Sequence, residues 1–210
     1  DFVNDKLEVL RPFGPTIAKV KMPQDLIDKL NEYTENVLKD QNKQDELNYG
    51  NKLAGNVKQE FIIEKDSMEK IGWGKFLAEG VREWVFKTNN RKITQFNIIN
   101  SWIVRQFQNE YNPSHWHGGH VSGVGYLKVP KTLGETSQNN KTMNHNGKLE
   151  MVHGSKAFLC KPTFRVTPRV GDFYFFPHYL MHAVYPFSQC DDERRSVSFN
   201  ATVDQSLFNE

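Results

Sequence analysis

The first part of the chain carries its hydrophobic residues at the spacing of helices. A run from Leu26 to Leu38, following Pro23, places its apolar side chains on one face and predicts a helix. A second run, from Met68 to Val85, predicts another helix. We expect both helices to cover one face of a sheet.

Local signals suggest where these elements begin and end. Asp66 and Glu69 have the spacing of a capping box, so the second helix should begin at Asp66 or Ser67. The polar segment 41–58 contains two glycines and is expected to be a loop. The segment Thr16–Val20 is expected to be a short strand.

From residue 93 onward the pattern becomes that of strands, with β-branched and aromatic residues in short runs separated by Gly and Pro. The expected strands are Ile93–Phe107, Ser122–Val129, Ala157–Leu159, Arg165–Thr167, Asp172–Phe176, His182–Tyr185 and Ser196–Val203. Short strands of this kind are typical of a sandwich, a barrel or a jelly roll. We therefore expect one domain, 1–210, in which an N-terminal strand and supporting helices (1–92) accompany a β-rich core (93–203).

Composition narrows the class of protein. The aromatic fraction of 12% is enough to build a core and excludes disorder over the whole length. The net charge of +2 gives no support for a nucleic-acid or acidic-membrane partner. The mean hydropathy is −0.65, and no apolar run is long enough to span a bilayer.

The cysteines indicate a compartment. Cys160 and Cys190 are too few for a disulfide scaffold, so two reduced thiols in the cytoplasm are expected. The chain begins with Asp1 rather than Met and shows no signal sequence, and we expect it to be trimmed.

The segment Lys131–Lys148 is polar, rich in Asn and Thr, and nearly free of apolar residues. Loops of this length in compact domains are usually functional lids or disordered. Its position makes it a candidate lid over a substrate.

The histidines are clustered in the sequence. His115 and His117 lie two positions apart in an extended stretch, so their side chains should point to the same face. Imidazole pairs of this kind suit Zn, Fe, Cu or Ni, and His182 is the candidate third ligand from a distant strand. We expect His120 and His178 either to support the ligands or to line the pocket.

The alternation from Arg194 to Asn200 supplies a second signal. Val197 and Phe199 share one face and must pack into a core, so the opposite face, which carries Arg194 and Ser196, should be polar and enclosed. A buried arginine needs an anion; its planar fork matches a carboxylate, and the serine hydroxyl can donate a further hydrogen bond. An internal ion pair explains the arginine equally well, and the candidate partners are Asp172, Asp191, Asp192 and Glu193.

These residues occur in a recognisable order: His-x-His, Ser122–Leu127, Gly171–Pro177, His182 and then Arg194-x-Ser196. The order resembles the iron(II)- and 2-oxoglutarate-dependent oxygenases, more narrowly the small prolyl-hydroxylase-like branch of bacteria and phages. The resemblance covers residues 95–203 and implies a mainly β fold with N-terminal helices (α+β). In that fold a double-stranded β-helix, or jelly roll, has helices packed on one sheet.

The resemblance also implies roles. His115 matches the first iron ligand and His182 the distal one. Arg194 and Ser196 match the pair that binds the far carboxylate of 2-oxoglutarate, and Tyr126 matches a strand tyrosine that reaches the same carboxylate. The implied cofactor is Fe(II), with 2-oxoglutarate and O2 as cosubstrates.

One position departs from the family pattern. Where the family places a carboxylate ligand, this chain has His117. A ligand and catalytic set of His115, His117 and His182 is ranked first. In a second alignment His117 is the first ligand and Gly119 takes the carboxylate position, as in the halogenase branch. In a third, His120, Asp172 or Glu150 completes the set, so the sequence leaves hydroxylation and halogenation both open.

The expected reaction couples oxidative decarboxylation of 2-oxoglutarate to hydroxylation of a substrate, with a prolyl or other peptidyl side chain favoured. The expected partners are therefore this cosubstrate and a protein or peptide, and the expected location is the cytoplasm, or the host cytoplasm for a phage chain. Two other classes stay open: a cupin-like three-His metalloenzyme that does not use 2-oxoglutarate, and a non-catalytic jelly-roll binding module. Trp102, Trp116 and Tyr179 either line the entrance or belong to the core, and the core is favoured.

Overall fold

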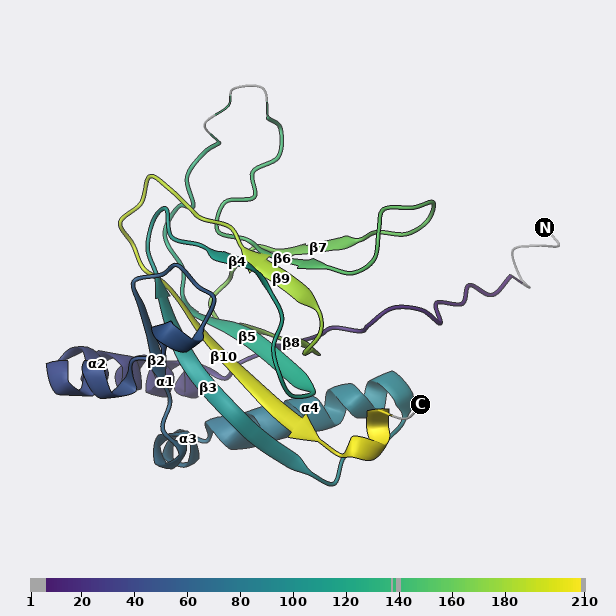
Figure 1. The fold of residues 1–210 in the computed structure, drawn as a ribbon, viewed down its shortest axis with the longest axis horizontal. Coiled ribbons are helices and arrows are strands. Elements are labelled where there is room, and N and C mark those ends of the chain that lie inside the picture. The colour runs from purple at the N-terminus through teal and green to yellow at the C-terminus, as the bar shows by residue number, and fades with distance from the viewer. Residues whose placement is uncertain (1–6, 137, 139–140, 209–210) are drawn as a thin grey trace.

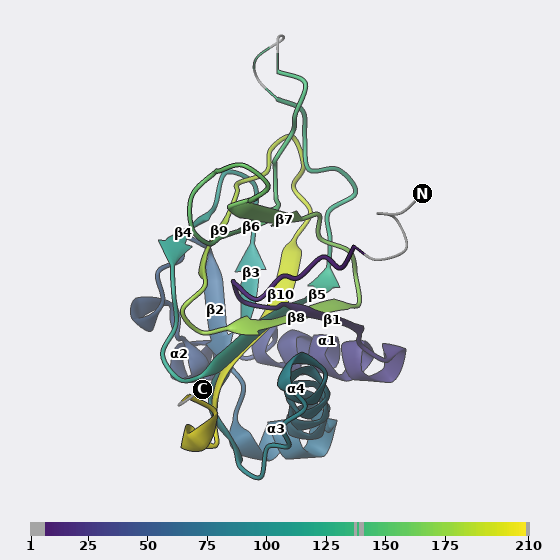
Figure 2. The same cartoon turned by 90° about the vertical axis from the view of Figure 1, so that its right-hand side faces the viewer.

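Two antiparallel sheets face each other, and helices cover the outer face of the larger one (Figures 1 and 2). The structure is a computed structural model that describes residues 7–136, 138 and 141–208. No helix within those ranges is long and apolar enough to cross a membrane. The arrangement confirms the expected α+β class with helices packed on one sheet.

The larger sheet has six strands in the order β1-β8-β5-β10-β3-β2. Their bounds are β1 (Ala18–Lys21), β2 (Gln59–Ile62), β3 (Phe96–Gln106), β5 (Val121–Lys128), β8 (Asp172–Pro177) and β10 (Arg194–Val203). Two of these strands, β1 and β2, come from the first 92 residues and form the two edges of the sheet.

The smaller sheet has four strands in the order β4-β9-β6-β7. Their bounds are β4 (Asn112–His115), β6 (Leu149–Val152), β7 (Thr163–Val166) and β9 (Met181–Val184). The two sheets pack through a compact apolar cluster that includes Tyr126, Leu149, Met151, Tyr174 and Phe176.

The helices are α1 (Gln24–Leu38), α2 (Gln41–Leu47), α3 (Lys65–Ile71) and α4 (Trp73–Asn89), with short 3-10 turns at Gly50–Lys52 and Gln205–Phe208. The main core lies between α1, α3, α4 and the larger sheet, where Leu30, Trp73 and Leu77 meet Phe173 and Phe199. Each such side chain contributes about 1.5–3 kcal/mol when fully removed from water. This core makes the larger sheet a rigid wall for whatever lies on its other face.

The expected second helix is two helices, because the chain turns at Gly72. Gly72 has φ +82°, a left-handed conformation that favours glycine, and its N–H donates to the carbonyls of Met68 and Glu69. The predicted capping box is wrong. Helix α3 begins after Glu64, and no side chain caps it.

The segment expected as a loop contains a helix. Asp40 caps α2 by accepting hydrogen bonds from the N–H groups of Asn42 and Lys43. Leu47 at the end of this helix packs against Phe61 of β2. The short apolar contact thus anchors both the unpredicted helix and the unpredicted edge strand.

The strand expected at Ala157–Leu159 is also wrong. These residues form the connection between β6 and β7, where Phe158 is 91% exposed. The strand that pairs with β7 is β6, whose Leu149 and Met151 are buried between the sheets. An apolar run without a partner strand cannot be told from a turn by its pattern alone.

Candidate functional site

Three histidines meet at the end of the smaller sheet. His115 is the last residue of β4 and lies directly across from His182 of β9 in the strand register, with ring centroids 4.3 Å apart. His117 follows two positions beyond β4, and its Nε2 lies 3.0 Å from Nε2 of His182. One ring nitrogen from each of the three lies within 4.8 Å of the others. The structure therefore brings together the three histidines that the sequence analysis ranked first.

Backbone carbonyls orient two of these rings. Nδ1 of His115 lies 2.6 Å from the carbonyl oxygen of Pro113, and Nδ1 of His182 lies 2.8 Å from that of Leu180. A carbonyl oxygen only accepts, so each Nδ1 must donate its proton, which leaves a lone pair on Nε2. Metal-binding histidines are usually oriented in this way. The lone pair of His182 then faces Nε2 of His117, and a proton or a cation must lie between them.

Burial keeps the three rings neutral. It lowers the pKa of His117 to about 3 and that of His182 to about 4, and the neighbouring histidines add to both shifts. The pKa of His115 is also lowered by burial, against the opposing hydrogen bond to Pro113. Neutral imidazole is the form that binds metal, so this donor set fits a divalent first-row transition metal.

Arg194 lies across the same cavity, at the start of β10. Its side chain is buried at 2% exposure, and only Nη1 has a partner, the Oε1 of Gln106 at 3.3 Å. Its Nε and Nη2 have no hydrogen-bond partner among the residues that the structure describes, and neither has the buried hydroxyl of Tyr126. The guanidinium carbon lies 5.0 Å from the centre of the Tyr126 ring. Burial lowers the pKa of Arg194, as expected for a cation that lacks a counter-ion.

The internal ion pair that could have explained Arg194 is not formed within the described ranges. The four acidic residues considered from the sequence are Asp172, Asp191, Asp192 and Glu193. Asp172 pairs with Lys21 at 2.9 Å, and Glu193 pairs with Arg105 at 2.8 Å. A buried charge without a partner is costly, so Arg194 is arranged to receive an anion from outside the chain.

The cavity between the sheets is shared by all these groups. It is lined by His115, His117, His182, Trp102, Gln106, Asn112, Arg194, Ser196 and Ser198, among others. Tyr126 pairs with Ser196 in the strand register and lies beneath Arg194. Three neutral nitrogen donors at one end and an unpaired cation at the other can hold a metal and a dianionic ligand that bridges toward the arginine.

The structure does not bring the alternative ligands into this cavity. Gly119 has φ +90°, and a Cβ there would meet Ile99 and the carbonyl oxygen of Ala201, away from the three histidines. His120 accepts a hydrogen bond from the N–H of Val203 instead. Glu150 pairs with Arg165, and Asp172 pairs with Lys21. His178 lies beside the site, with Nδ1 3.0 Å from the carbonyl oxygen of His117.

Two polar residues at the site escaped the sequence analysis. Glu60 of β2 and Asn112 of β4 both line a second pocket of about 190 Å³ beside His115 and His117. Each has one buried oxygen without a hydrogen-bond partner among the described residues. The only sequence signal was the apolar run after Glu60, from Phe61 to Ile63, which marks an edge strand.

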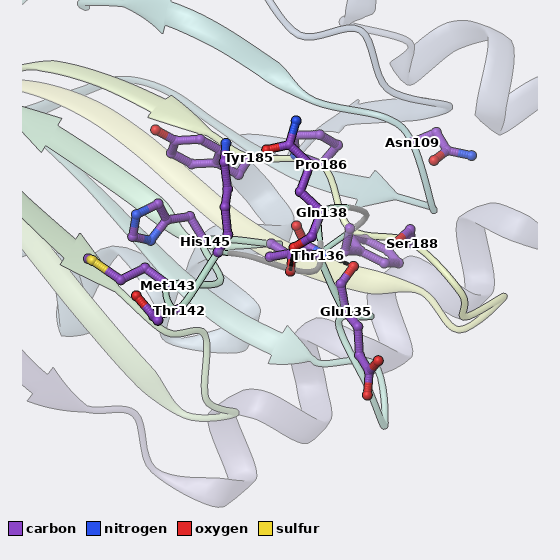
Figure 3. A pocket seen from close by; sticks show the side chains of 13 residues that line it. Asn109, Glu135, Thr136, Gln138, Thr142, Met143, His145, Tyr185, Pro186 and Ser188 are labelled. Atoms are coloured by element: carbon purple, nitrogen blue, oxygen red, sulfur yellow. Dashed lines mark hydrogen bonds between the residues drawn. The ribbon is translucent and has the colours of Figure 1, made fainter.

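The loop expected to act as a lid forms a pocket of its own. Figure 1 shows the segment between β5 and β6 extending away from the sheets. Some of its described residues, with Asn109 and Tyr185–Ser188, line a pocket of about 770 Å³ (Figure 3). None of them lines the cavity of the three histidines.

Comparison with known proteins places the chain in a class. Residues 100–200 match a family described as "Putative 2OG-Fe(II) oxygenase". No curated protein sequence matches the chain. Among solved structures, it is similar to a prolyl-4-hydroxylase from Pseudomonas putida, with a TM-score of 0.57 at 17% identity, over 88% of this chain and 91% of that chain.

Two further structures show how broadly the fold is used. A viral collagen prolyl hydroxylase from Paramecium Bursaria Chlorella virus-1, in complex with 2OG, gives a TM-score of 0.55 at 15% identity, over 89% of this chain and 96% of that chain. HygX from Streptomyces hygroscopicus, with nickel, 2-oxoglutarate and hygromycin B bound, gives a TM-score of 0.57 at 10% identity, over 90% of this chain and 83% of that chain. At these identities the likeness is one of fold, the double-stranded β-helix.

The match to the 2OG-Fe(II) oxygenase family spans 101 of the 210 residues. This family is a class of enzymes, and it implies Fe(II) and 2-oxoglutarate. The match argues against both alternatives from the sequence, the non-catalytic binding module and the cupin-like enzyme that does not use 2-oxoglutarate.

Proposed function

We propose that the protein is a hydroxylase in which His115, His117 and His182 hold the iron. The proposal is supported by the three neutral rings, whose ligand atoms lie within 4.8 Å of one another. Iron(II) with 2-oxoglutarate supplies the oxidising power, since oxidative decarboxylation of the cosubstrate is coupled to hydroxylation by O2. His117 takes the position where the family places a carboxylate, so the protein itself contributes no negative charge to this set.

The 2-oxoglutarate is held at its far end by Arg194, with hydroxyl groups from Ser196 and Tyr126. The observation that carries this assignment is the buried guanidinium with two unpartnered nitrogens across the cavity from the histidines. A carboxylate would complete the hydrogen bonds of Arg194 and compensate its charge. The unpartnered hydroxyl of Tyr126 would find its acceptor in the same group.

The remaining residues shape the reaction space. Trp102 packs at 5.7 Å from the ring of His117 and, with Phe176 and Val184, forms the apolar part of the cavity wall. Such walls exclude water from the reacting centre and orient the bound cosubstrate. Ser198 places a further hydroxyl group on the same wall.

A prolyl or other peptidyl side chain is the proposed target. Support comes from two similar folds, those of the bacterial prolyl-4-hydroxylase and the viral collagen prolyl hydroxylase. The two free cysteines, Cys160 and Cys190, favour the reducing cytoplasm as the compartment.

The test is an anaerobic titration of the iron(II)-loaded protein with 2-oxoglutarate. Bidentate chelation gives a weak visible charge-transfer band in this family, and we expect the band to saturate at one equivalent. Iron binding without a band would contradict the assignment of Arg194. No iron binding would contradict the assignment of the histidines.

A further inference from the structure

A small pocket opens beside two of the three histidines, His115 and His117. It has a volume of about 190 Å³, and its walls include His115, His117, Trp102, Trp116, Asn112 and Glu60. It shares both histidines with the cavity described above, whereas Arg194 and Ser196 do not reach it. A group in this pocket would therefore lie next to the metal without displacing the cosubstrate.

Glu60 is the one acidic side chain among the described residues that line this pocket, and its Oε1 lacks a hydrogen-bond partner there. It is 3% exposed, and its Oε1 has no hydrogen-bond partner within the described ranges. Burial raises the pKa of Glu60 to about 7. A buried carboxyl group without a partner costs free energy, and a hydrogen-bond donor or a cation would stabilise it.

None of the described neighbouring residues supplies such a donor or cation to Oε1 of Glu60. Lys52 also lines the pocket, but its Nζ lies over the ring of Tyr49, 5.6 Å from the centroid, and it forms no ion pair with Glu60 among the described residues. Glu60 is also outside the group of histidines whose ligand atoms converge. Among the described residues it therefore has no ion-pair partner, and it does not lie with the converging metal-ligand atoms.

The other walls favour the same kind of ligand. Asn112 contributes a buried Oδ1 that also lacks a donor. Trp116 is 65% exposed at the rim, and Trp102 is buried at the base. Indole faces attract organic cations, with about 0.5–2 kcal/mol per contact. Two unpartnered acceptors and two indoles together match an alkylammonium group.

We propose that this pocket binds an ammonium group of the substrate, with Glu60 as the residue that recognises it. The inference rests on the proposed function in taking the three histidines as the iron site, because it places the substrate's amine beside the reacting carbon. Glu60 is a specificity-determining residue in this account: it selects substrates that carry an amine next to the position to be hydroxylated.

The experiment measures binding of matched probes by titration calorimetry. The protein is loaded with nickel(II), which does not turn over, and with saturating 2-oxoglutarate, and is then titrated with benzylamine or with benzyl alcohol. We expect the amine to bind at least tenfold more tightly than the alcohol. We expect Glu60→Gln to remove that preference, and Trp116→Leu to weaken amine binding several-fold.

A control variant and a second probe pair sharpen the test. Glu64→Gln removes the same charge four residues away, at an exposed position that pairs with Lys43, and should leave amine binding unchanged. A tripeptide amide with a free α-amino group, compared with its N-acetylated form, shows whether a peptide terminus or a small amine is the better source of the ammonium group. The melting temperature of each variant establishes that it is folded.

The outcomes separate the two proposals. Equal affinity for amine and alcohol, or an unchanged preference in Glu60→Gln, overturns the ammonium pocket while nickel and 2-oxoglutarate binding still support the proposed function. Loss of nickel binding in Glu60→Gln also overturns it, because Glu60 would then be a ligand. Amine binding that depends on Glu60 in a protein that takes up no metal supports the pocket and contradicts the iron site.

Discussion

Arg194 and Arg195 are consecutive residues of β10, yet they have opposite electrostatic surroundings. Arg195 is 1% exposed and donates to Glu193 and to Glu35 of α1, at 2.8 and 2.9 Å. Arg194, on the other face of the strand, is equally buried and forms no ion pair within the described part of the chain. The alternation of a strand thus places one arginine in the scaffold and the other in the cavity.

This contrast predicts opposite effects of one substitution on stability. Arg194→Met should raise the stability of the ligand-free protein by about 1–3 kcal/mol, because it replaces an unpaired buried charge by an apolar side chain. Arg195→Met should lower it by about 1.5–3 kcal/mol, because it removes the charged hydrogen bonds to Glu193 and Glu35 while Glu193 keeps Arg105. Thermal unfolding in the absence of 2-oxoglutarate distinguishes them, and equal destabilisation would mean that Arg194 is structural.

The same variant should lose the cosubstrate. We expect Arg194→Met to weaken 2-oxoglutarate binding to the nickel-loaded protein by about 2–4 kcal/mol, the usual cost of removing one member of a buried charge pair. Calorimetry measures this directly. A matched control is Arg165→Met, which removes an arginine from the ion pair with Glu150 on the smaller sheet. If both variants bind 2-oxoglutarate like the parent protein, the cavity is not the cosubstrate site.

Part of this site was predictable because it depends on alternation along one strand. Arg194 and Ser196 share a face of β10 through the period of two, and the apolar Val197 and Phe199 decide which face is enclosed. His115 and His117 also point into one cavity, but β4 ends at His115, so strand alternation alone does not explain the position of His117.

The features that the sequence analysis missed depend on contacts between distant segments or on local turns, which the sequence pattern does not encode. Glu60 reaches the pocket because β2 pairs with β3 at the sheet edge, with Glu60 opposite Val104. That register is set by pairing between distant segments. The break at Gly72 was likewise hidden, because a glycine inside an amphipathic run predicts either a weak helix or its end.

The metal ligands can be tested one at a time. His182→Ala should abolish binding of iron(II) under anaerobic conditions, because it removes one of three donors and the ring that faces His117. His145→Ala should not change it, since His145 lines the separate loop pocket (Figure 3). Metal content after desalting gives the answer. Iron retained at full stoichiometry by His182→Ala would contradict the three-histidine site.

Gly119 provides a test of the second ligand alignment. Gly119→Ala should destabilise the protein by about 1–3 kcal/mol, because alanine is strained at a φ of +90° and its Cβ would meet Ile99 and Ala201. The folded variant should still bind iron through the same three histidines. Denaturant unfolding and metal content measure the two effects. Iron retained in full by His115→Ala would favour the alignment that starts at His117, because His115 is a ligand only in the first alignment.

Asp204 should make stability depend on pH at the end of β10. Its carboxylate accepts hydrogen bonds from the hydroxyl and N–H of Thr94 and from the N–H of Gln95. These bonds, chiefly that from the Thr94 side chain, lower its pKa from 3.8 to about 2. A carboxyl group whose pKa is lower in the folded state stabilises the protein above its unfolded pKa and loses that effect as the pH falls through the folded value.

Asp204→Asn should therefore be less stable than the parent at pH 7, with a difference that is constant down to about pH 5 and shrinks between pH 4 and pH 2. Denaturant unfolding of both proteins across this range measures the difference, and Asp45→Asn, at an exposed position of α2, serves as the control. A difference that stays constant down to pH 2 would show that the hydrogen bonds to Thr94 and Gln95 do not favour the ionised form.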